Sequence, residues 1–173
     1  PSNHPLMPPR RLKRRLMGGA AMGERVTLCT IGFAKKSLRK FIGLLQDAGV
    51  TKVIDIRLHN TSQLAGYAKR DDLEFILETF GIAYEHVPEL APTEELMKSY
   101  KKGSTDWETY TVAFKELLNQ RDAARLWLPP SRVFDDGVNC LLCAEDSPKR
   151  CHRRLVAEHF AALFPDIEVR HLV

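Results

Sequence analysis

The sequence predicts an α/β fold: a single compact domain in which a mainly parallel sheet of about five strands has helices on both faces, a Rossmann-like three-layer arrangement. Short apolar runs of strand length alternate with segments whose apolar residues recur at helical spacing. Because a helix separates successive strands, crossovers rather than hairpins join them, and the sheet becomes parallel and buried on both faces. The 173 residues, 44% of them hydrophobic, suffice for one core.

The first half of the chain alternates strands and helices. Ser37 is a favourable N-cap for the first helix, and Gly49 and Gly81 are favourable stops for the first and second helices. Asp71 or Asp72 opens the second helix. In order, the predicted elements are a strand over residues 26–31, a helix over 37–49, a strand over 53–56, a helix over 71–81 and a strand over 82–87.

The second half continues the alternation after a helical middle part. Thr105 and Glu108 have capping-box spacing, which predicts a long helix directly after them. Ser147 and Pro148 fit the N-cap and first turn of the last helix. The predicted elements are a short helix over 93–102, a helix from 105 through Leu118, a connection over 128–131, a strand over 138–142, a helix from 147 to about 164 and a strand over 167–169.

Residues 1–22 are predicted to be a basic, flexible N-terminal extension, which leaves residues 23–173 for the α/β domain. The extension carries five of the 26 Lys and Arg residues and no acid, and its Pro and Gly residues break any helix. A basic arm for nucleic acid or anionic lipid and a targeting peptide are the alternatives. The remaining 21 cations face 22 acids, so bulk charge gives the domain itself no support as a nucleic-acid binder.

Composition also bears on location and cofactors. No apolar run approaches the roughly 20 residues that span a bilayer, so a soluble protein without membrane contact is expected. Four Cys residues without a secretory signal favour a reducing, cytoplasmic location over a disulfide framework. The sequence has neither a Walker-type loop nor a Gly-x-Gly-x-x-Gly loop, and no cofactor is predicted.

The densest group of reactive side chains lies in residues 141–154, where an apolar strand turns into the last helix. The segment holds Cys143, Glu145, Cys151 and His152. Its four cations are Lys149, Arg150, Arg153 and Arg154. In open α/β folds, ligands bind where strands end and helices begin, because unpaired N–H groups point outward there. We therefore expect the functional site in this segment, with an anion at the amino end of the last helix.

Polar residues also end other predicted strands. Thr30, Asp55 and Cys143 each lie at a carboxyl end, and such ends meet at one edge of a parallel sheet. Asp55 and Arg57 project to the same side of their strand. They form either a structural ion pair or a site in which Arg57 clamps a phosphate or carboxylate. Tyr67, in the polar loop before the second helix, is a further candidate ligand-binding residue.

Cys143 and Cys151 have three interpretations: small residues that fill a strand–helix corner, a reactive thiolate, or metal ligands. Two geometric points count against zinc. Cys140 and Cys143 are three residues apart in a strand, so they point to opposite faces. Cys151 and His152 are adjacent, so they point about 100° apart on a helix. No metal is predicted.

His152 and Glu145 each have two interpretations. His152 is either a solvated side chain on the helix surface or a general acid–base group. Glu145 either accepts hydrogen bonds at the helix start or acts as a catalytic acid or base. A Cys-based phosphatase is not a good fit, because Lys149 rather than an arginine stands six positions after Cys143.

Four segments, taken in order, resemble the domain of unknown function 488 family. They are Thr30-Ile31-Gly32, residues 53–57, residues 81–90, and Cys143-Ala144-Glu145 followed by Cys151-His152-Arg153. The resemblance runs from about Thr27 to Phe160 and implies a compact α/β domain. It implies no particular reaction.

Two classes of function follow from these observations. In the first, the protein is an enzyme that acts on a phosphorylated or nucleotide-like molecule at the carboxyl edge of the sheet. In the second, it is a non-catalytic module that binds nucleic acid or protein through the same edge. The candidate catalytic residues are Cys143, Cys151, Asp55, Glu145 and His152. The candidate ligand-binding residues are Arg57, Lys149, Arg150, Arg153, Thr30 and Tyr67.

Overall fold

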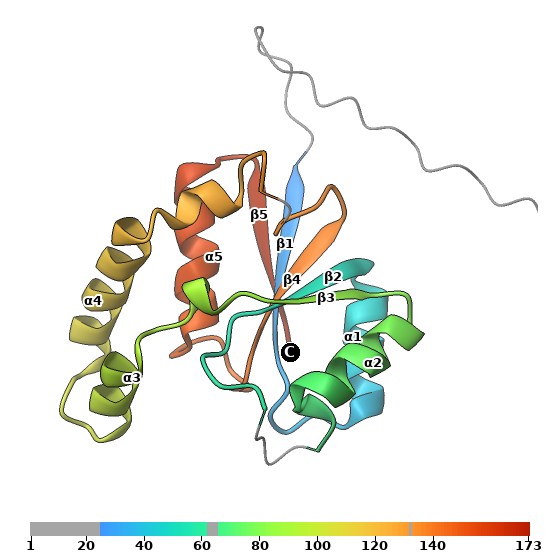
Figure 1. Ribbon diagram of the computed structural model, residues 1–173, viewed down its shortest axis with the longest axis horizontal. Coiled ribbons are helices and arrows are strands. Elements are labelled where there is room, and N and C mark those ends of the chain that lie inside the picture. Colours follow the sequence, from blue (N-terminus) through green and yellow to red (C-terminus); the bar gives the residue numbers. More distant parts are fainter. Residues whose placement is uncertain (1–24, 62–65, 132) are drawn as a thin grey trace, which may run out of the picture.

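A parallel sheet forms the centre of the fold in the computed structural model, which describes residues 25–61, 66–131 and 133–173 (Figure 1). Among these residues the sheet has five strands in the order β3-β2-β4-β1-β5, and every pairing is parallel. The strands are β1 (Val26–Gly32), β2 (Val50–Asp55), β3 (Ala83–His86), β4 (Val138–Cys143) and β5 (Ile167–Leu172). The predicted α/β fold is confirmed. The predicted extension over residues 1–22 lies outside the described residues.

Helices cover both faces of the sheet, as predicted. In the part of the chain that the structure describes, two helices lie on one side and three on the other (Figure 1). The first side has α1 (Leu38–Asp47) and α2 (Arg70–Thr79), and the second has α3 (Glu94–Lys101), α4 (Trp107–Gln120) and α5 (His152–Leu163). Short 3-10 helices lie in the connections: η1 (Gly66–Ala68), η2 (Pro88–Leu90) and η3 (Ala123–Leu126). In the described ranges, no helix has both the length and the apolar character needed to cross a bilayer.

The central strand β4 is buried on both faces, and its side chains alternate between two cores. Cys140 and Leu142 belong to the core beneath α1 and α2, whereas Leu141 belongs to the core beneath α4 and α5. Cys143 therefore points to the same side as Leu141, where it faces Tyr110 of α4 across a cavity. The prediction that Cys140 and Cys143 point to opposite faces is confirmed.

Side-chain caps start several helices. Ser37 caps α1 by accepting a hydrogen bond from the N–H of Lys40 at 3.2 Å, as the sequence predicts. The predicted cap of α4 is wrong by one residue. Asp106 rather than Thr105 is the N-cap, because the Asp106 Oδ1 accepts from the N–H of Thr109 at 2.7 Å.

The start of α5 is a larger correction. The helix begins at His152, and its N-cap is Cys151 in an extended conformation with φ −131° and ψ 138°. The sequence analysis placed this cap at Ser147. The side chain of Arg153 instead binds the backbone carbonyls of residues 145–146 and holds the preceding segment as a loop. The anion site predicted at a helix opening near Ser147 is therefore wrong in its location.

Two strands are longer than predicted. β2 begins at Val50, and its pairing with β4 has an irregularity between Val50 and Lys52. β5 continues to Leu172, because it pairs with β1 as far as Ile31. Neither extension has a clear apolar pattern in the sequence, since alternate positions face solvent.

Candidate functional site

A cavity of about 350 Å³ lies at the carboxyl edge of the sheet. Cys143, the last residue of β4, and Arg57, which directly follows β2, both line it. Residues of helices α3 and α4 and of the loop between β4 and α5 also line it. The structure thus brings Arg57, Cys143 and Glu145 to one concave edge, whereas Asp55, which was expected there with them, does not line the cavity.

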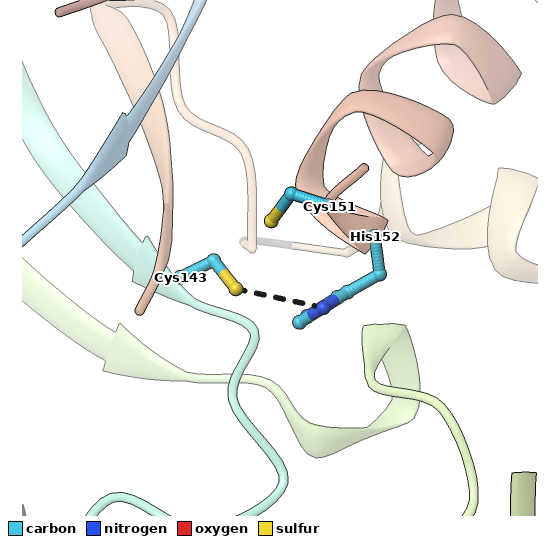
Figure 2. A group of neighbouring side chains, drawn as sticks. All are labelled: Cys143, Cys151 and His152. Atoms are coloured by element: carbon cyan, nitrogen blue, oxygen red, sulfur yellow. Dashed lines mark hydrogen bonds between the residues drawn. The ribbon is translucent and has the colours of Figure 1, made fainter. Parts of the chain in front are cut away.

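Three side chains converge at the buried end of the cavity: Cys143, Cys151 and His152 (Figure 2). Their sulfur and nitrogen atoms lie within 4.8 Å of one another, and Cys143 Sγ is 3.5 Å from His152 Nδ1. Glu145 joins them, because its Oε2 accepts from Cys143 Sγ at 2.9 Å and from Cys151 Sγ at 3.4 Å. Both thiols are 2% exposed, whereas Glu145 is exposed. The carboxylate therefore connects the buried sulfurs with the open part of the cavity.

The close approach of two backbones positions Glu145. A Cβ atom at Gly32 would lie 1.6 Å from the Glu145 carbonyl oxygen and 2.9 Å from Arg153 Nη1. The contact continues with the N–H of Ala34, which donates to the carbonyl of Ala144 at 2.9 Å. Glycine at the end of β1 therefore allows the loop after β4 to lie directly on β1.

Arg153 holds the same loop from the interior. Its guanidinium donates to the carbonyls of Glu145 and Asp146, to Thr30 Oγ1 at 3.3 Å and to Cys151 Sγ at 3.4 Å. No carboxylate of the described residues lies within ion-pair distance of it. The sequence suggested Thr30 and Arg153 as ligand-binding residues. Both side chains are fully buried, and neither lines the cavity.

His152 has a fixed orientation. Its Nε2 donates to the carbonyl oxygen of Ile56 at 2.9 Å, and its ring meets that of Phe114 edge-on at a centroid distance of 5.9 Å. Burial by itself lowers the pKa of His152, but the hydrogen bond with Cys151, the Ile56 carbonyl and the charge of Glu145 outweigh it, so the pKa is raised. The side chain is therefore not the solvated surface residue that one interpretation of the sequence allowed.

Cys151 and Glu145, two acidic groups near His152, have pKa values shifted in opposite directions. The adjacent Cys143 sulfur, followed by burial, raises the pKa of Cys151. Burial on its own would raise the pKa of Glu145, but the hydrogen bond from Cys143 and the charge of His152 lower it overall. The cluster thus favours an ionised Glu145 carboxylate beside a protonated Cys151 thiol.

The objection that Cys151 and His152 point about 100° apart is wrong. It assumed that both residues are helical, but Cys151 is the extended N-cap and only His152 has helical geometry. The turn in the backbone at the cap directs both side chains toward Cys143 (Figure 2). These three residues are the group in the described ranges that offers metal ligands, and Glu145 contacts the two sulfurs.

Asp55 and Arg57 form the ion pair that was one of their two interpretations. Arg57 Nε and Nη2 donate to the two oxygens of Asp55 at 2.8 and 2.7 Å, and Tyr84 and Asn60 donate to the same carboxylate. Burial alone would raise the pKa of Asp55, but the hydrogen bonds from Arg57 lower it overall. Asp55 is fully buried behind Arg57 and does not line the cavity, whereas Arg57 does.

Comparison with known proteins identifies the family. Residues 37–160 match the model described as Domain of unknown function DUF488, from the N-cap of α1 into α5. The chain belongs to this family. The match contains the whole cluster around Cys143, but it begins after the Thr30-Ile31-Gly32 motif that forms part of the resemblance in sequence. No curated protein and no solved structure matches the chain.

In this DUF488 family member, an aromatic wall forms the side of the cavity opposite the strands. Tyr100 of α3 and Trp107 and Tyr110 of α4 line it, with ring centroids 4.9 to 5.6 Å apart. Exposed Lys101 and Arg150 line the opening. None of Tyr100, Trp107, Tyr110 and Lys101 is among the site residues predicted from the sequence. Their helical spacing is equally typical of ordinary packing, so no local signal marks them as site residues.

Of the other suggested ligand-binding residues, one lines the cavity and two do not. Arg150 lines the cavity, but its neighbour Lys149 is exposed and does not. Tyr67 lies on the side of α1 and α2, where its hydroxyl donates to the carbonyls of Phe33 at 3.2 Å and Lys36 at 2.9 Å. Tyr67 therefore braces the loop after β1 and lies outside the cavity lining.

Proposed function

We propose that this protein is an enzyme that acts on a phosphorylated or nucleotide-like small molecule bound in the cavity at the carboxyl edge of the sheet. The observation that carries the proposal is that one cavity combines an aromatic wall, cations at its opening and a cluster of thiol, imidazole and carboxylate groups at its buried end. Its volume of about 350 Å³ is in the range of small-molecule sites.

The walls support the choice of ligand. Tyr100 and Trp107 are half-buried, so their rings offer surface on which a planar base can stack. Arg57 is neutralised by Asp55, which leaves Lys101 and Arg150 against the single carboxylate of Glu145 among the charged lining residues. This excess of positive charge favours an anion at the cavity opening.

The buried end supports an enzyme. Cys143 lies within hydrogen-bond reach of Glu145 and His152, and Glu145 also within reach of Cys151, and such a group supplies nucleophilic or proton-transfer chemistry. The pKa of Glu145 is also lowered and that of His152 raised, in each case because hydrogen bonds and neighbouring charges outweigh burial, and shifted pKa values of this kind are typical of functional sites.

Calorimetric titration with nucleoside monophosphates, the matching nucleosides and inorganic phosphate tests the ligand. We expect the nucleotide to bind more tightly than the nucleoside or inorganic phosphate. The double variant Lys101→Ala/Arg150→Ala is expected to weaken nucleotide binding at least about tenfold, because charge-assisted hydrogen bonds are lost. Lys149→Ala is the matched control, since Lys149 neighbours Arg150 but does not line the cavity. Equal binding by both variants would refute this ligand site.

Product analysis by chromatography then separates an enzyme from a binding module. The enzyme converts the bound ligand, and His152→Ala abolishes the conversion while leaving the aromatic wall in place. A ligand that binds and is recovered unchanged under all conditions would favour the non-catalytic module.

A further inference from the structure

We infer that Cys143, Cys151 and His152, together with Glu145, bind a zinc ion at the buried end of the cavity. Thiolate, imidazole and carboxylate groups are the ligands that zinc prefers in proteins. Here two buried sulfurs and one ring nitrogen converge (Figure 2) and lie within 4.8 Å of one another. Glu145 Oε2 contacts both sulfurs.

Two of the separations fit a tetrahedral ion. With zinc–sulfur bonds of about 2.3 Å and bonds to nitrogen or oxygen of about 2.0 Å, adjacent ligand atoms of a tetrahedron lie about 3.5 Å apart. Cys143 Sγ and His152 Nδ1 are 3.5 Å apart, and Cys151 Sγ and Glu145 Oε2 are 3.4 Å apart. The hydrogen bond between Cys143 and Glu145, at 2.9 Å, has to lengthen modestly.

The hydrogen bonding of His152 supplies a second observation. Its Nε2 donates to the carbonyl oxygen of Ile56 at 2.9 Å, so the proton of the neutral ring is on Nε2. The lone pair is then on Nδ1, which is the nitrogen that faces Cys143. A backbone carbonyl that fixes the tautomer in this way is a common partner of metal-binding histidines.

Charge balance supplies a third observation. Arg153 is fully buried and, among the described residues, has no carboxylate within ion-pair distance. It donates to Cys151 Sγ at 3.4 Å. Two thiolates and one carboxylate around a divalent ion carry one net negative charge, which the guanidinium neutralises.

This inference goes beyond the proposed function and rests on it only in the choice of reaction. A zinc ion at this position holds both thiols as ligands and supplies Lewis-acid chemistry toward a phosphoryl or carbonyl oxygen in the cavity. Glu145 is the exposed member of the ligand set, and all four members line the cavity.

Metal analysis of the full-length protein tests the site. We expect equilibrium dialysis against zinc, followed by elemental analysis, to give one ion per chain. Cobalt substitution is expected to produce a thiolate-to-cobalt charge-transfer band. Cys143→Ala and Cys151→Ala abolish stoichiometric binding. Cys140→Ala is the matched control, because Cys140 is equally buried in the same strand but faces the other core, and it retains the ion.

Glu145→Gln is a second variant for the case that the cysteine variants fail to fold. It is expected to keep the fold, since the backbone of Glu145 and not its side chain binds Arg153. It is expected to lower zinc affinity about tenfold or more and to alter the cobalt spectrum, with an unchanged circular dichroism spectrum. Absence of metal from the wild-type protein after dialysis, or one ion per chain in the Cys143→Ala variant, would overturn the inference. These readouts use no nucleotide, so they succeed or fail independently of the proposed ligand.

Discussion

Two buried arginines at the carboxyl edge of the sheet have very different surroundings. Arg57 meets the carboxylate of Asp55 through two hydrogen bonds, and Tyr84 and Asn60 complete the network. Arg153 meets two backbone carbonyls, one hydroxyl and one sulfur. In the first network the charges of Arg57 and Asp55 balance each other, so it holds a loop without any ligand. It is called the closed network below. The second carries a charge that its described surroundings do not balance, which is typical of a site that receives an anion or a metal–thiolate group.

The largest expected effect comes from disrupting the loop that Arg153 binds. Gly32→Ala would place a Cβ atom 1.6 Å from the Glu145 carbonyl oxygen, so the loop that Arg153 binds must leave β1. We expect a loss of about 5 kcal/mol or more in the free energy of unfolding, measured by urea denaturation. Gly43→Ala in α1 is the control, because its Cβ meets nothing within 4 Å, and it is expected to stabilise by about 0.5 to 1 kcal/mol.

Breaking the closed network is expected to have the next largest effect. Asp55→Asn leaves the buried Arg57 without its counter-charge, and a loss of about 3 to 5 kcal/mol in the free energy of unfolding is expected. Glu168→Gln removes an exposed partner of Arg25 and is expected to change stability by less than about 1 kcal/mol. Similar losses in the two variants would show that the closed network stabilises no more than a surface pair.

Replacing Arg153 tests the difference between the two arginines. Arg153→Met leaves the carbonyls of Glu145 and Asp146 without a donor, so stability is expected to fall by about 2 kcal/mol. If Arg153 also balances a zinc–thiolate group, zinc affinity falls about tenfold or more in the same variant. Arg57→Met is the comparison, with a loss of stability but little change in zinc affinity. Equal effects of both variants on zinc would contradict the distinction drawn between them.

A pH dependence of the closed network is also expected. The folded state lowers the pKa of Asp55 below its unfolded value, so this residue adds stability above the unfolded pKa of about 3.9 and loses it as the pH falls through the folded pKa. Urea titrations of wild type and Asp55→Asn are expected to differ most near neutral pH and to converge in acid below about pH 4. A constant difference across this range would show that Asp55 does not act through its charge.

Much of the fold was predictable because its signals are local. The cap at Ser37, the stops at Gly49 and Gly81 and the apolar strand before Cys143 are each defined by neighbouring residues. The grouping of Cys143 with Glu145 and His152 was also accessible, since a short loop joins the end of one strand to the next helix.

Other parts of the site were not predictable. The start of α5 depends on Arg153, whose side chain reaches back to the loop and across to Thr30, a residue far away in the sequence. The aromatic wall depends on how α3 and α4 fold back over the edge of the sheet. Tyr100 and Trp107 have the spacing of packing residues, and only their position beside Cys143 makes them part of a cavity.

The sequence by itself determined the parallel α/β fold, the opposite directions of Cys140 and Cys143 and the position of the reactive segment at a strand end. Periodicity and capping act over a few residues, so they are written in the local sequence. The tertiary structure decided which side chains face the cavity, that Arg153 is internal while Arg150 is not, and that Cys151 turns toward Cys143. These outcomes depend on contacts between β1, β4, α4 and α5, because burial and backbone crossings such as that at Gly32 exist only after the chain has packed.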